Sequence, residues 1–245
     1  MGTMRNWKVG VAWLAIACSG GDSSVDGFVP TGEDRDGDGL TDVEEAYLGS
    51  NPDAVDTDRD GWDDRVEVES YTDPLDGFDH PYTGGWAIDR CRHDLVPSGG
   101  NAAGDVALNF SLTDQHGDPV RLHDFCGRAI IVASAAQWCE PCRQEARFLQ
   151  SMFEQYAHEG LIVVTLMGED VDRRPPSQAV LQDWADEFDL THPVLQDTSF
   201  GATSFYSGSG GNLPLNHLLR PGAVVQRKNL VEVTRQDVLD LLAID

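Results

Sequence analysis

Hydrophobic residues in the second half of the chain alternate between continuous runs and stripes with a spacing of three or four. The runs 130–136 and 161–167 are rich in β-branched residues and have the length of buried strands. Between these runs lies the apolar stripe of an amphipathic helix, made by Phe148, Leu149, Met152, Phe153 and Tyr156. The alternation predicts an α/β fold in which helices cover both faces of a central sheet.

The pattern continues to the C-terminus with one more helix, a hairpin and a final helix. A helix is predicted for 178–188 and a closing hairpin for 214–227, whereas the Gly- and Ser-rich stretch 200–211 is predicted as a loop. Thr234 and Asp237 form a capping-box-like pair, which predicts the start of the last helix.

Two cysteines lie where the strand 130–136 is followed by its helix. Cys139 and Cys142 form a C-x-x-C directly after Trp138, and Pro141 fits the first helical turn, where its missing N–H costs nothing. Unpaired N–H groups and the helix dipole favour an anion there, so the first thiol is biased toward thiolate. Cys139 is therefore predicted to be an exposed nucleophile and Cys142, one turn further in, the resolving thiol.

Two other uses of a C-x-x-C fit the sequence less well. A zinc site needs further ligands, and Cys91 and Cys126 lie far upstream at unsuitable spacing. A purely structural disulfide between Cys139 and Cys142 would close a ring too small to add much stability. The redox interpretation is therefore preferred.

The sequence W-C-x-P-C after an apolar strand resembles the thioredoxin superfamily, and its flanks narrow the resemblance. Upstream, 104–125 is similar to the opening G-x-x-A-x-x-F-x-L-x-D-x-x-G-x-x-V-x-L of the redoxin or TlpA-like branch. Downstream, 211–225 is similar to the hairpin P-x-x-x-L-x-x-x-G-x-V-V of that branch. The resemblance covers about 104–245 and implies a thioredoxin-like domain with a central mixed sheet.

The resemblance also implies roles for residues outside the C-x-x-C. In this family the proline that matches Pro214 is cis and faces the dithiol, so Pro214 and Trp138 are expected to shape the site. The backbone of Leu213 would then be free to pair with an incoming peptide strand. No organic cofactor is implied.

Two departures from the family pattern bear on activity. The strand before the dithiol lacks the buried acid that thioredoxin uses to move a proton, and Glu140 lies between the cysteines instead. Its charge should oppose the Cys139 thiolate, which argues against a strongly oxidising enzyme. Peroxiredoxins carry Thr three residues before the reactive cysteine, where this chain has Ala136, so a thiol peroxidase is only an alternative.

The charge of the chain is concentrated in its N-terminal part. The 245 residues include 42 acidic and 17 basic ones, and the net charge of −25 argues against nucleic acid or an anionic membrane surface as partners. Of the acidic residues, 22 lie between Asp22 and Asp94 alongside only five arginines. This region needs an explanation of its own.

Two acidic repeats account for the concentration of negative charge in the N-terminal part. Residues 34–45 and 56–67 place carboxylates at positions 1, 3, 5, 9 and 12 of a loop with glycine at position 6, which is the spacing of a calcium loop. The carbonyl at position 7 would add a ligand. The predicted ligands are Asp34, Asp36, Asp38, Leu40, Asp42 and Glu45, then Asp56, Asp58, Asp60, Trp62, Asp64 and Glu67. Calcium is the predicted structural cofactor of 33–80, because these carboxylates would otherwise repel one another.

The arrangement of the repeats narrows their class. The connection between the two loops is short and no long helix precedes the first, which resembles thrombospondin type 3 repeats rather than paired EF-hands. Residues 72–79 look like a degenerate third copy. A small, loop-rich, calcium-stiffened spacer is expected; a non-catalytic scaffold or adhesion protein with working calcium repeats is the alternative.

The first residues predict export. A short basic segment precedes the apolar run 9–17, which is too short to span a bilayer. The motif ending at Cys18 resembles a bacterial lipobox, although its leucine lies four rather than three residues before the cysteine. We therefore predict a lipoprotein signal peptide over 1–18, lipidation at Cys18 and a flexible tether over 19–32, with an ordinary cleaved signal peptide as the alternative.

The Gly- and Pro-rich stretch 81–103 is predicted as a linker. It carries Cys91, whose predicted partner is Cys126, because exported chains usually join the cysteines outside their active pair. Closing that loop would contribute about 3–4 kcal/mol in the chain-entropy model. The alternative makes Cys126 a third redox thiol that relays to Cys142.

Together these features predict a membrane-anchored, extracytoplasmic thiol–disulfide oxidoreductase in a bacterial cell envelope, with the outer membrane favoured. Cys139 would attack a substrate disulfide and Cys142 would resolve the mixed disulfide. The expected partners are disulfide-containing envelope proteins, an upstream thiol electron donor and, through the lipid anchor, the membrane.

Overall fold

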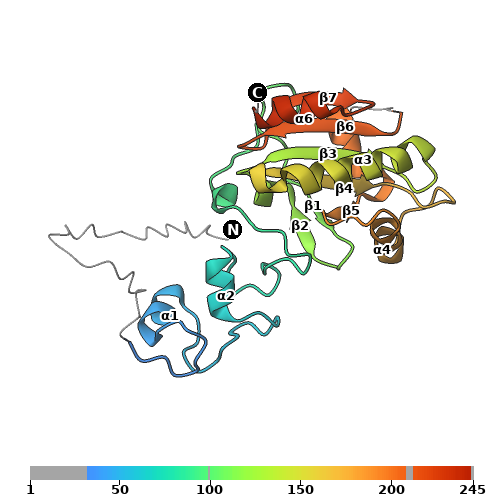
Figure 1. Ribbon diagram of the computed structural model, residues 1–245. Coiled ribbons are helices and arrows are strands. Elements are labelled where there is room, and N and C mark those ends of the chain that lie inside the picture. The colour runs from blue at the N-terminus through green and yellow to red at the C-terminus, as the bar shows by residue number, and fades with distance from the viewer. Residues whose placement is uncertain (1–31, 99, 208–211, 244–245) are drawn as a thin grey trace.

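The computed structural model describes residues 32–98, 100–207 and 212–243 (Figure 1). The predicted signal peptide, the lipidation site Cys18 and all but the last residue of the tether 19–32 lie outside the described residues. Within the described ranges, no helix has the length and apolar character needed to cross a membrane.

A five-stranded mixed sheet forms the centre of the C-terminal domain, in the order β5-β4-β3-β6-β7. β3 pairs in parallel with β4 and β4 with β5, whereas β6 runs antiparallel to both β3 and β7. The strands are β3 Ala129–Ala135, β4 Leu161–Met167, β5 Val194–Gln196, β6 Leu215–Arg220 and β7 Val224–Leu230. The two predicted strands and the hairpin are confirmed, while β5 was not predicted.

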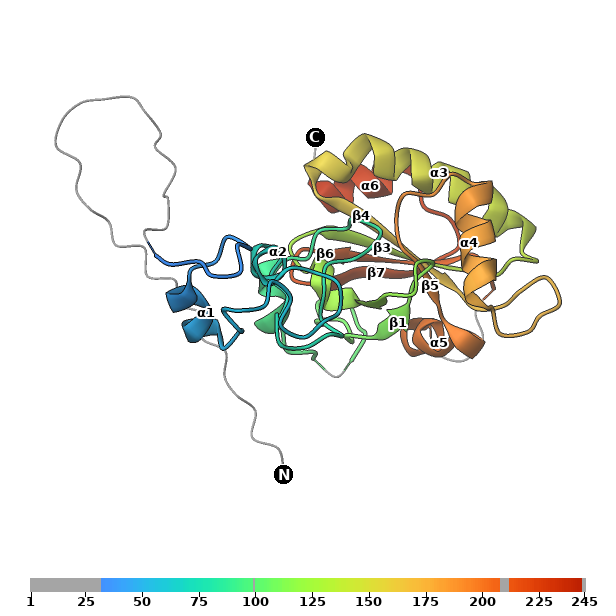
Figure 2. The ribbon, with the colours of Figure 1, turned by 90° about the horizontal axis from the view of Figure 1, so that it is seen from below.

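Helices cover one face of this sheet. Alternate residues of β3, such as Ile131 and Ala133, contribute to the core that the helices share with the sheet. The covering helices are α3 Glu140–Tyr156, α4 Gln178–Glu187 and α6 Arg235–Leu242 (Figure 2). The last begins at the predicted capping box, because Thr234 and Asp237 exchange side-chain and backbone hydrogen bonds.

The opposite face is covered mostly by non-helical chain. There the β1–β2 hairpin, Ser111–Thr113 with Pro119–Arg121, lies beside the short helix α5, Gly201–Ser207 (Figure 2). The prediction of a loop over 200–211 was therefore wrong for its first part. Asp197 explains the helix, since its carboxylate accepts from two N–H groups of the first turn, at 2.8 and 2.9 Å.

The stretch 81–103 is not a free linker, which corrects the predicted domain boundary. Tyr82, Trp86 and Ile88 are buried in the core beneath the sheet, against alternate residues of β3. These large side chains fill the face that the helices leave uncovered, which outweighs the Gly- and Pro-rich composition around them. The oxidoreductase domain thus begins near residue 80.

A buried polar cluster joins the end of the acidic region to this domain. Asp79 accepts from Arg92 and, at 2.8 Å, from Arg121, and Arg92 also lies 3.4 Å from Asp124. The hydroxyl of Tyr82 donates to the other oxygen of Asp124. Because each of the two buried carboxylates is shared by several donors, the cluster fixes the direction in which the acidic region leaves the domain.

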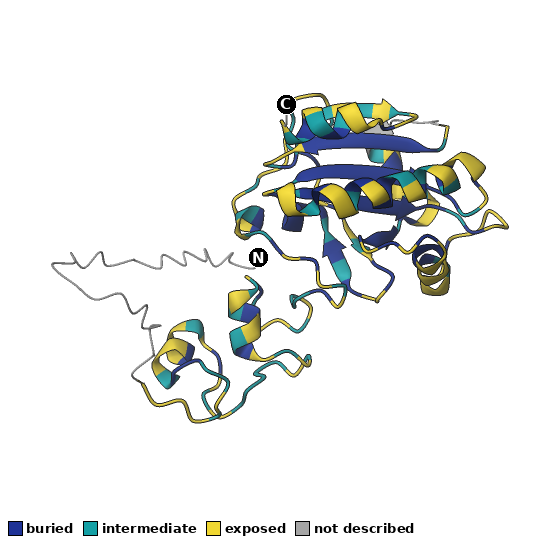
Figure 3. Cartoon of the chain, in the orientation of Figure 1, coloured by how far each residue is buried: buried dark blue, intermediate teal, exposed yellow. Residues whose placement is uncertain are grey.

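Residues 32–80 fold into two loops, each followed by a short helix, and we call them the repeat module. Its helices are α1, Asp42–Leu48, and α2, Asp64–Glu69. α1 starts at a capping box in which Thr41 and Glu44 bond each other's backbone N–H groups. Figure 3 shows that the central strands β3 and β4 of the C-terminal domain are buried throughout, whereas the repeat module is mostly exposed or half-buried.

Candidate functional site

The C-x-x-C forms a disulfide at the N-terminus of α3. Cys139 is the N-cap residue of this 17-residue helix, and the backbone N–H of Cys142 points at its sulfur, at 3.3 Å. The Cα atoms of the two cysteines lie 5.3 Å apart, and Pro141 occupies the first turn. When the pair is reduced, that N–H group and the helix dipole stabilise the Cys139 thiolate, as the sequence predicts.

In the disulfide form Cys139 is buried, contrary to the expectation of an exposed nucleophile. Its exposed fraction is 3%, and that of Cys142 is 2%. Both belong to an apolar cluster against which Phe200 and Leu213 pack. The ring of Phe200 lies so close to Gly168 that a Cβ there would be 2.0 Å from it, so this wall requires glycine.

The cis proline is confirmed. The Leu213–Pro214 bond is cis, and the next residue, Leu215, pairs with Ser134 near the end of β3. Since β3 leads directly into the C-x-x-C, this pairing places Pro214 beside the dithiol, where the family resemblance implied it. Leu213 packs against the cluster that holds both cysteines.

A half-buried acid is present near the dithiol, on the helix rather than on the strand. Glu145 lies one turn after Cys142 on α3, and its carboxylate accepts from Asn216 on β6 at 2.8 Å. Burial raises the pKa of Glu145 to about 7, and nearby Glu232 adds to the shift, against the hydrogen bonds from Asn216 and the Val233 backbone. The i, i+3 spacing from Cys142 was the sequence signal that could have indicated it.

The loop between β4 and α4 contacts Trp138 from two sides. Glu169 accepts from the indole N–H at 2.7 Å, and the Gln137 N–H donates to the Glu169 carbonyl at 2.9 Å. The guanidinium carbon of Arg173 lies 4.0 Å from the centre of the indole ring. Glu169 and Arg173 are therefore part of the site, although no motif marked them.

The second disulfide lies at the other end of β3. The structure joins Cys91 and Cys126, with a Cα–Cα distance of 6.0 Å, immediately before the strand begins. The seven residues of β3 at about 3.3 Å each put roughly 23 Å between this bridge and the C-x-x-C. That separation contradicts the alternative in which Cys126 relays electrons to Cys142.

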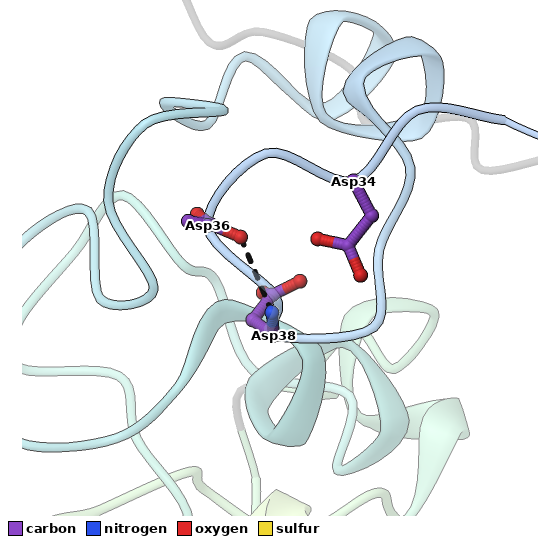
Figure 4. Close-up of side chains that lie close together, drawn as sticks. All are labelled: Asp34, Asp36 and Asp38. Atoms are coloured by element: carbon purple, nitrogen blue, oxygen red, sulfur yellow. Dashed lines mark hydrogen bonds between the residues drawn. The ribbon is translucent and has the colours of Figure 1, made fainter.

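Both acidic repeats close into loops of the same geometry. In the first loop Asp34, Asp36 and Asp38 each bring one oxygen within 4.8 Å of the others, and Figure 4 shows these side chains around the interior of the loop. Asp34 accepts from two backbone N–H groups, of Gly37 and Gly39, at 2.8 and 3.2 Å. In the second loop Asp56, Asp58 and Asp60 form the equivalent cluster.

The carboxylates at position 12 test whether a cation fits these loops. Glu45 and Glu67 are completely buried, and neither oxygen of either residue has a hydrogen-bond partner. One oxygen each of Asp36, Asp58 and Asp60 is also buried without a partner. Buried carboxylate oxygens without donors are strongly unfavourable unless a cation satisfies them, so the donor set fits a hard, oxygen-seeking ion.

The position-9 carboxylates of Asp42 and Asp64, which the sequence predicts as ligands, lie outside the clusters of aspartate oxygens and make hydrogen bonds within the loops. Asp42 accepts from the backbone and side chain of Arg35, at 3.2 and 2.7 Å. Asp64 does the same with Thr57, at 2.8 and 2.7 Å. In each repeat the residue at position 2 thus uses the position-9 carboxylate to close the loop, and the acid also begins the following helix.

Comparison with known proteins agrees with the two-part organisation. Residues 34–52 match the bacterial TSP3 repeat. ResA of Bacillus cereus, a thiol-disulfide oxidoreductase, is 26% identical over 135 residues, covering 55% of this chain and 73% of that protein. The thioredoxin-like protein YneN of Bacillus subtilis is 28% identical over 142 residues, covering 58% of this chain and 79% of that protein.

A solved structure was also found. A secreted thiol-disulfide isomerase of Corynebacterium glutamicum is 26% identical with a TM-score of 0.49, covering 56% of this chain and 82% of that one. The mixed sheet, the helix-capping dithiol and the relatives make this chain a thiol–disulfide oxidoreductase of thioredoxin-like fold. Residues 103–229 match the AhpC/TSA family model, and the chain belongs to the AhpC/TSA family.

Proposed function

We propose that this chain reduces disulfides of exported envelope proteins through Cys139 and Cys142. The observation that carries the proposal is the position of the pair, at the start of α3 and beside the cis Leu213–Pro214 segment. A backbone segment with a cis proline next to a helix-capping thiolate leaves room for an extended peptide to lie across the sulfur. The backbone of Leu213 is the proposed pairing partner of that peptide.

The exchange proceeds in two displacements. The Cys139 thiolate attacks one sulfur of the substrate disulfide, which forms a mixed disulfide and releases the other substrate sulfur as a thiolate that takes up a proton. Cys142, once deprotonated, attacks the sulfur of Cys139 and releases the second substrate thiolate. Two electrons pass to the substrate, and the Cys139–Cys142 disulfide must then be reduced by an upstream dithiol protein.

Glu145 is the proposed proton acceptor for the second displacement. Its carboxyl lies one helical turn from Cys142, away from Glu140 on the exposed side of the motif. With its pKa near 7, the carboxylate form is available to take the Cys142 proton at neutral pH, and the acid can return it when the pair is reduced again.

The reduction potential of the pair tests this proposal. Calcium-loaded protein is equilibrated in redox buffers and alkylated, with Cys139→Ser and Cys142→Ser as controls. A potential near that of thioredoxin, about −270 mV, is expected; one near that of DsbA, about −120 mV, would make the protein an oxidant instead. Peroxide consumption that depends on Cys139 would indicate a thiol peroxidase, and the absence of any reversible couple would leave a calcium-dependent scaffold.

The repeat module is proposed to bind calcium. The carboxylates at positions 1, 3, 5 and 12 and the carbonyls of Leu40 and Trp62 would hold one ion in each loop. Calcium supplies positive charge that offsets the repulsion between these carboxylates. Without it the buried position-12 glutamates favour protonation: burial and neighbouring aspartates raise the pKa of Glu45 to about 7 and that of Glu67 to about 9.

The location outside the cytoplasm and the lipid anchor complete the proposal. The presence of a second disulfide away from the active pair supports an oxidising compartment, and the sequence before Cys18 supports lipidation there. Mass spectrometry of the N-terminal peptide from the membrane fraction tests this directly. A diacylated or triacylated Cys18 is expected, and Cys18→Ser should move the protein out of the membrane fraction.

A further inference from the structure

The turn from Asp170 to Arg174 holds one arginine over the active-site tryptophan. The Asp170 carboxylate accepts from the backbone N–H groups of Asp172 and Arg174 at 2.8 and 2.9 Å, and from the Arg174 side chain at 3.1 Å. The Asp170 N–H donates to the Arg174 carbonyl at 2.9 Å, which closes the turn. At its tip Arg173 adopts a φ of 61°, an unfavourable conformation for a residue with a side chain.

The two arginines of this turn have different surroundings. Arg174 is neutralised by ion pairs with Asp170 and Asp172. Within the residues that the structure describes, the Arg173 guanidinium has neither an ion pair nor a hydrogen bond, and its contact is the indole of Trp138. A guanidinium that lies over an aromatic face keeps its N–H donors, which point outward in its own plane, available to a third group.

The same turn is tied to the segment before the dithiol. Besides the Trp138–Glu169 bond, the Val171 N–H donates to the side chain of Gln137 at 3.1 Å. Trp138 directly precedes Cys139 and is 37% exposed, so the Trp138–Arg173 pair lies at the surface next to the dithiol, within reach of a polypeptide bound there. Arg173 is therefore a fixed, unneutralised cation at the entrance to the dithiol, in a chain with a net charge of −25.

We propose that Arg173 is a specificity-determining residue that binds a carboxylate next to the disulfide of the substrate polypeptide. The proposal rests on the proposed disulfide-reductase function and adds the class of substrate. The guanidinium fork matches a carboxylate in geometry, and its contact with Trp138 reduces the side-chain freedom lost on binding. A substrate without an acidic group would gain nothing from the Arg173 charge, and a basic one would be repelled by it, whereas Glu140 and Glu169 act in the opposite sense, so the preference depends on direct contact with Arg173.

The test uses cystine peptides that differ only at the residues flanking the cystine: Asp, Asn or Lys. The rate constant for reduction of each peptide by the dithiol form of the full, calcium-loaded protein is measured in wild type, Arg173→Glu and Arg173→Lys. Arg235→Glu is the matched control, because Arg235 stacks on Tyr156 toward the other end of α3 and its replacement changes the net charge equally. The Cys139 thiolate pKa is followed by absorbance in each variant.

Arg173→Glu is expected to lower the Asp-peptide to Lys-peptide rate ratio by roughly three- to tenfold relative to Arg235→Glu. Arg173→Lys should restore most of the ratio, which a purely packing role for the stacked arginine would not do. The difference should shrink in 0.5 M salt. An equal loss of rate for all three peptides, matched by a shifted thiolate pKa, would overturn the inference, as would an unchanged ratio. If wild-type protein reduces none of the peptides, the reductase function fails and the inference falls with it.

Discussion

In the oxidoreductase domain every residue of β3 and β4 is buried and nearly all are apolar, whereas the completely buried side chains of the repeat module are Glu45, Asp64 and Glu67. Within residues 32–80, all of which the structure describes, Leu40 and Pro74 are the only buried residues with apolar side chains. One region is held by the removal of hydrocarbon from water, and the other is organised around negative charge.

The two regions depend differently on their surroundings. The oxidoreductase domain has three clusters of buried apolar side chains, which need no further partner once they are packed. Buried carboxylates are stable only with a partner, and in the module two of the three acids lack one. Between them, Asp79 and Asp124 are paired with arginines, and Asp124 also accepts from Tyr82, so this cluster belongs with the domain.

Removal of calcium should have the largest effect and should separate the two regions. In a chelator, amide hydrogens of α1 and α2 are expected to lose their protection, because the carboxylates then repel one another, while those of β3 and β4 keep theirs. Hydrogen exchange with mass spectrometry measures both at once. Retained protection of α1 and α2 without a cation would show that the module does not need one.

Two glutamate variants on α2 test directly whether the module binds calcium through Glu67. Glu67→Gln removes a buried, unpartnered charge, whereas Glu69→Gln changes an exposed residue of the same helix that pairs with Arg65. Calorimetric titration should show the affinity for calcium falling at least about tenfold in the first variant and hardly changing in the second, since ligand charge sets the affinity of such loops. Equal affinities in the two variants would exclude Glu67 as a ligand.

Loss of the Cys91–Cys126 disulfide is expected to weaken the oxidoreductase domain without touching its chemistry. Replacing both cysteines by serine should lower the free energy of unfolding by about 3–4 kcal/mol, because the 35-residue loop is no longer closed in the unfolded chain. Guanidinium titration measures the loss. The potential of the Cys139–Cys142 pair should stay constant, and a clear shift would revive the relay alternative.

Glu145→Gln should stabilise the domain and slow the enzyme. The folded protein holds this carboxyl with a pKa of about 7 against an ordinary 4.5, so the folded state binds more protons and stability falls as pH rises through this window. At pH 8 the variant should be more stable by on the order of 1–3 kcal/mol, with no gain below pH 4.5. Asn216 can still donate to the new amide oxygen.

Kinetics of the same variant test the proposed proton transfer. Resolution of the mixed disulfide should slow, while the first attack by Cys139 keeps its rate, because only Cys142 uses Glu145. Glu187→Gln is a suitable control, since Glu187 pairs with Arg143 on the surface next to Cys142. A stabilised variant with an unchanged resolution rate would reduce Glu145 to a structural residue.

Much of the fold and the central chemistry could be predicted from local patterns. The strand β4, the capping box at Thr234 and the C-x-x-C each depend on residues close in sequence, and the structure confirms them. The burial of Tyr82 beneath the sheet could not be predicted, because it depends on which face the helices leave open. The same holds for α5, whose start depends on a single capping aspartate.

In the candidate sites, too, some features follow from the local sequence and others depend on contacts between separate parts of the chain. The ligand pattern of the repeats predicted the clusters at positions 1, 3 and 5, whereas the use of Asp42 and Asp64 to close the loops depends on the residues at position 2. Glu145 and Arg173 were missed because each acts across two elements: one toward β6, the other over Trp138. Periodicity identifies elements, but it does not tell which side chains of different elements meet.

Two buried histidines should give the oxidoreductase domain an acid limit that the module does not share. Burial lowers the pKa of His192 to about 3, and burial with nearby Lys228 lowers that of His217 to about 4. Below about pH 6.5 the unfolded chain binds a proton at each histidine, whereas the folded chain does not. The free energy of unfolding therefore falls as the pH is lowered, by about 1.4 kcal/mol per pH unit for each histidine. His192→Gln should remove the contribution of one histidine to this slope, whereas replacement of the exposed His158 by Gln should leave the slope unchanged. Urea titrations of the chelator-treated protein between pH 7.5 and 4.5 measure how the free energy of unfolding changes with pH. The same pH dependence in both variants would mean that His192 is protonated in the folded domain, despite its contacts with Thr165 and Gln150.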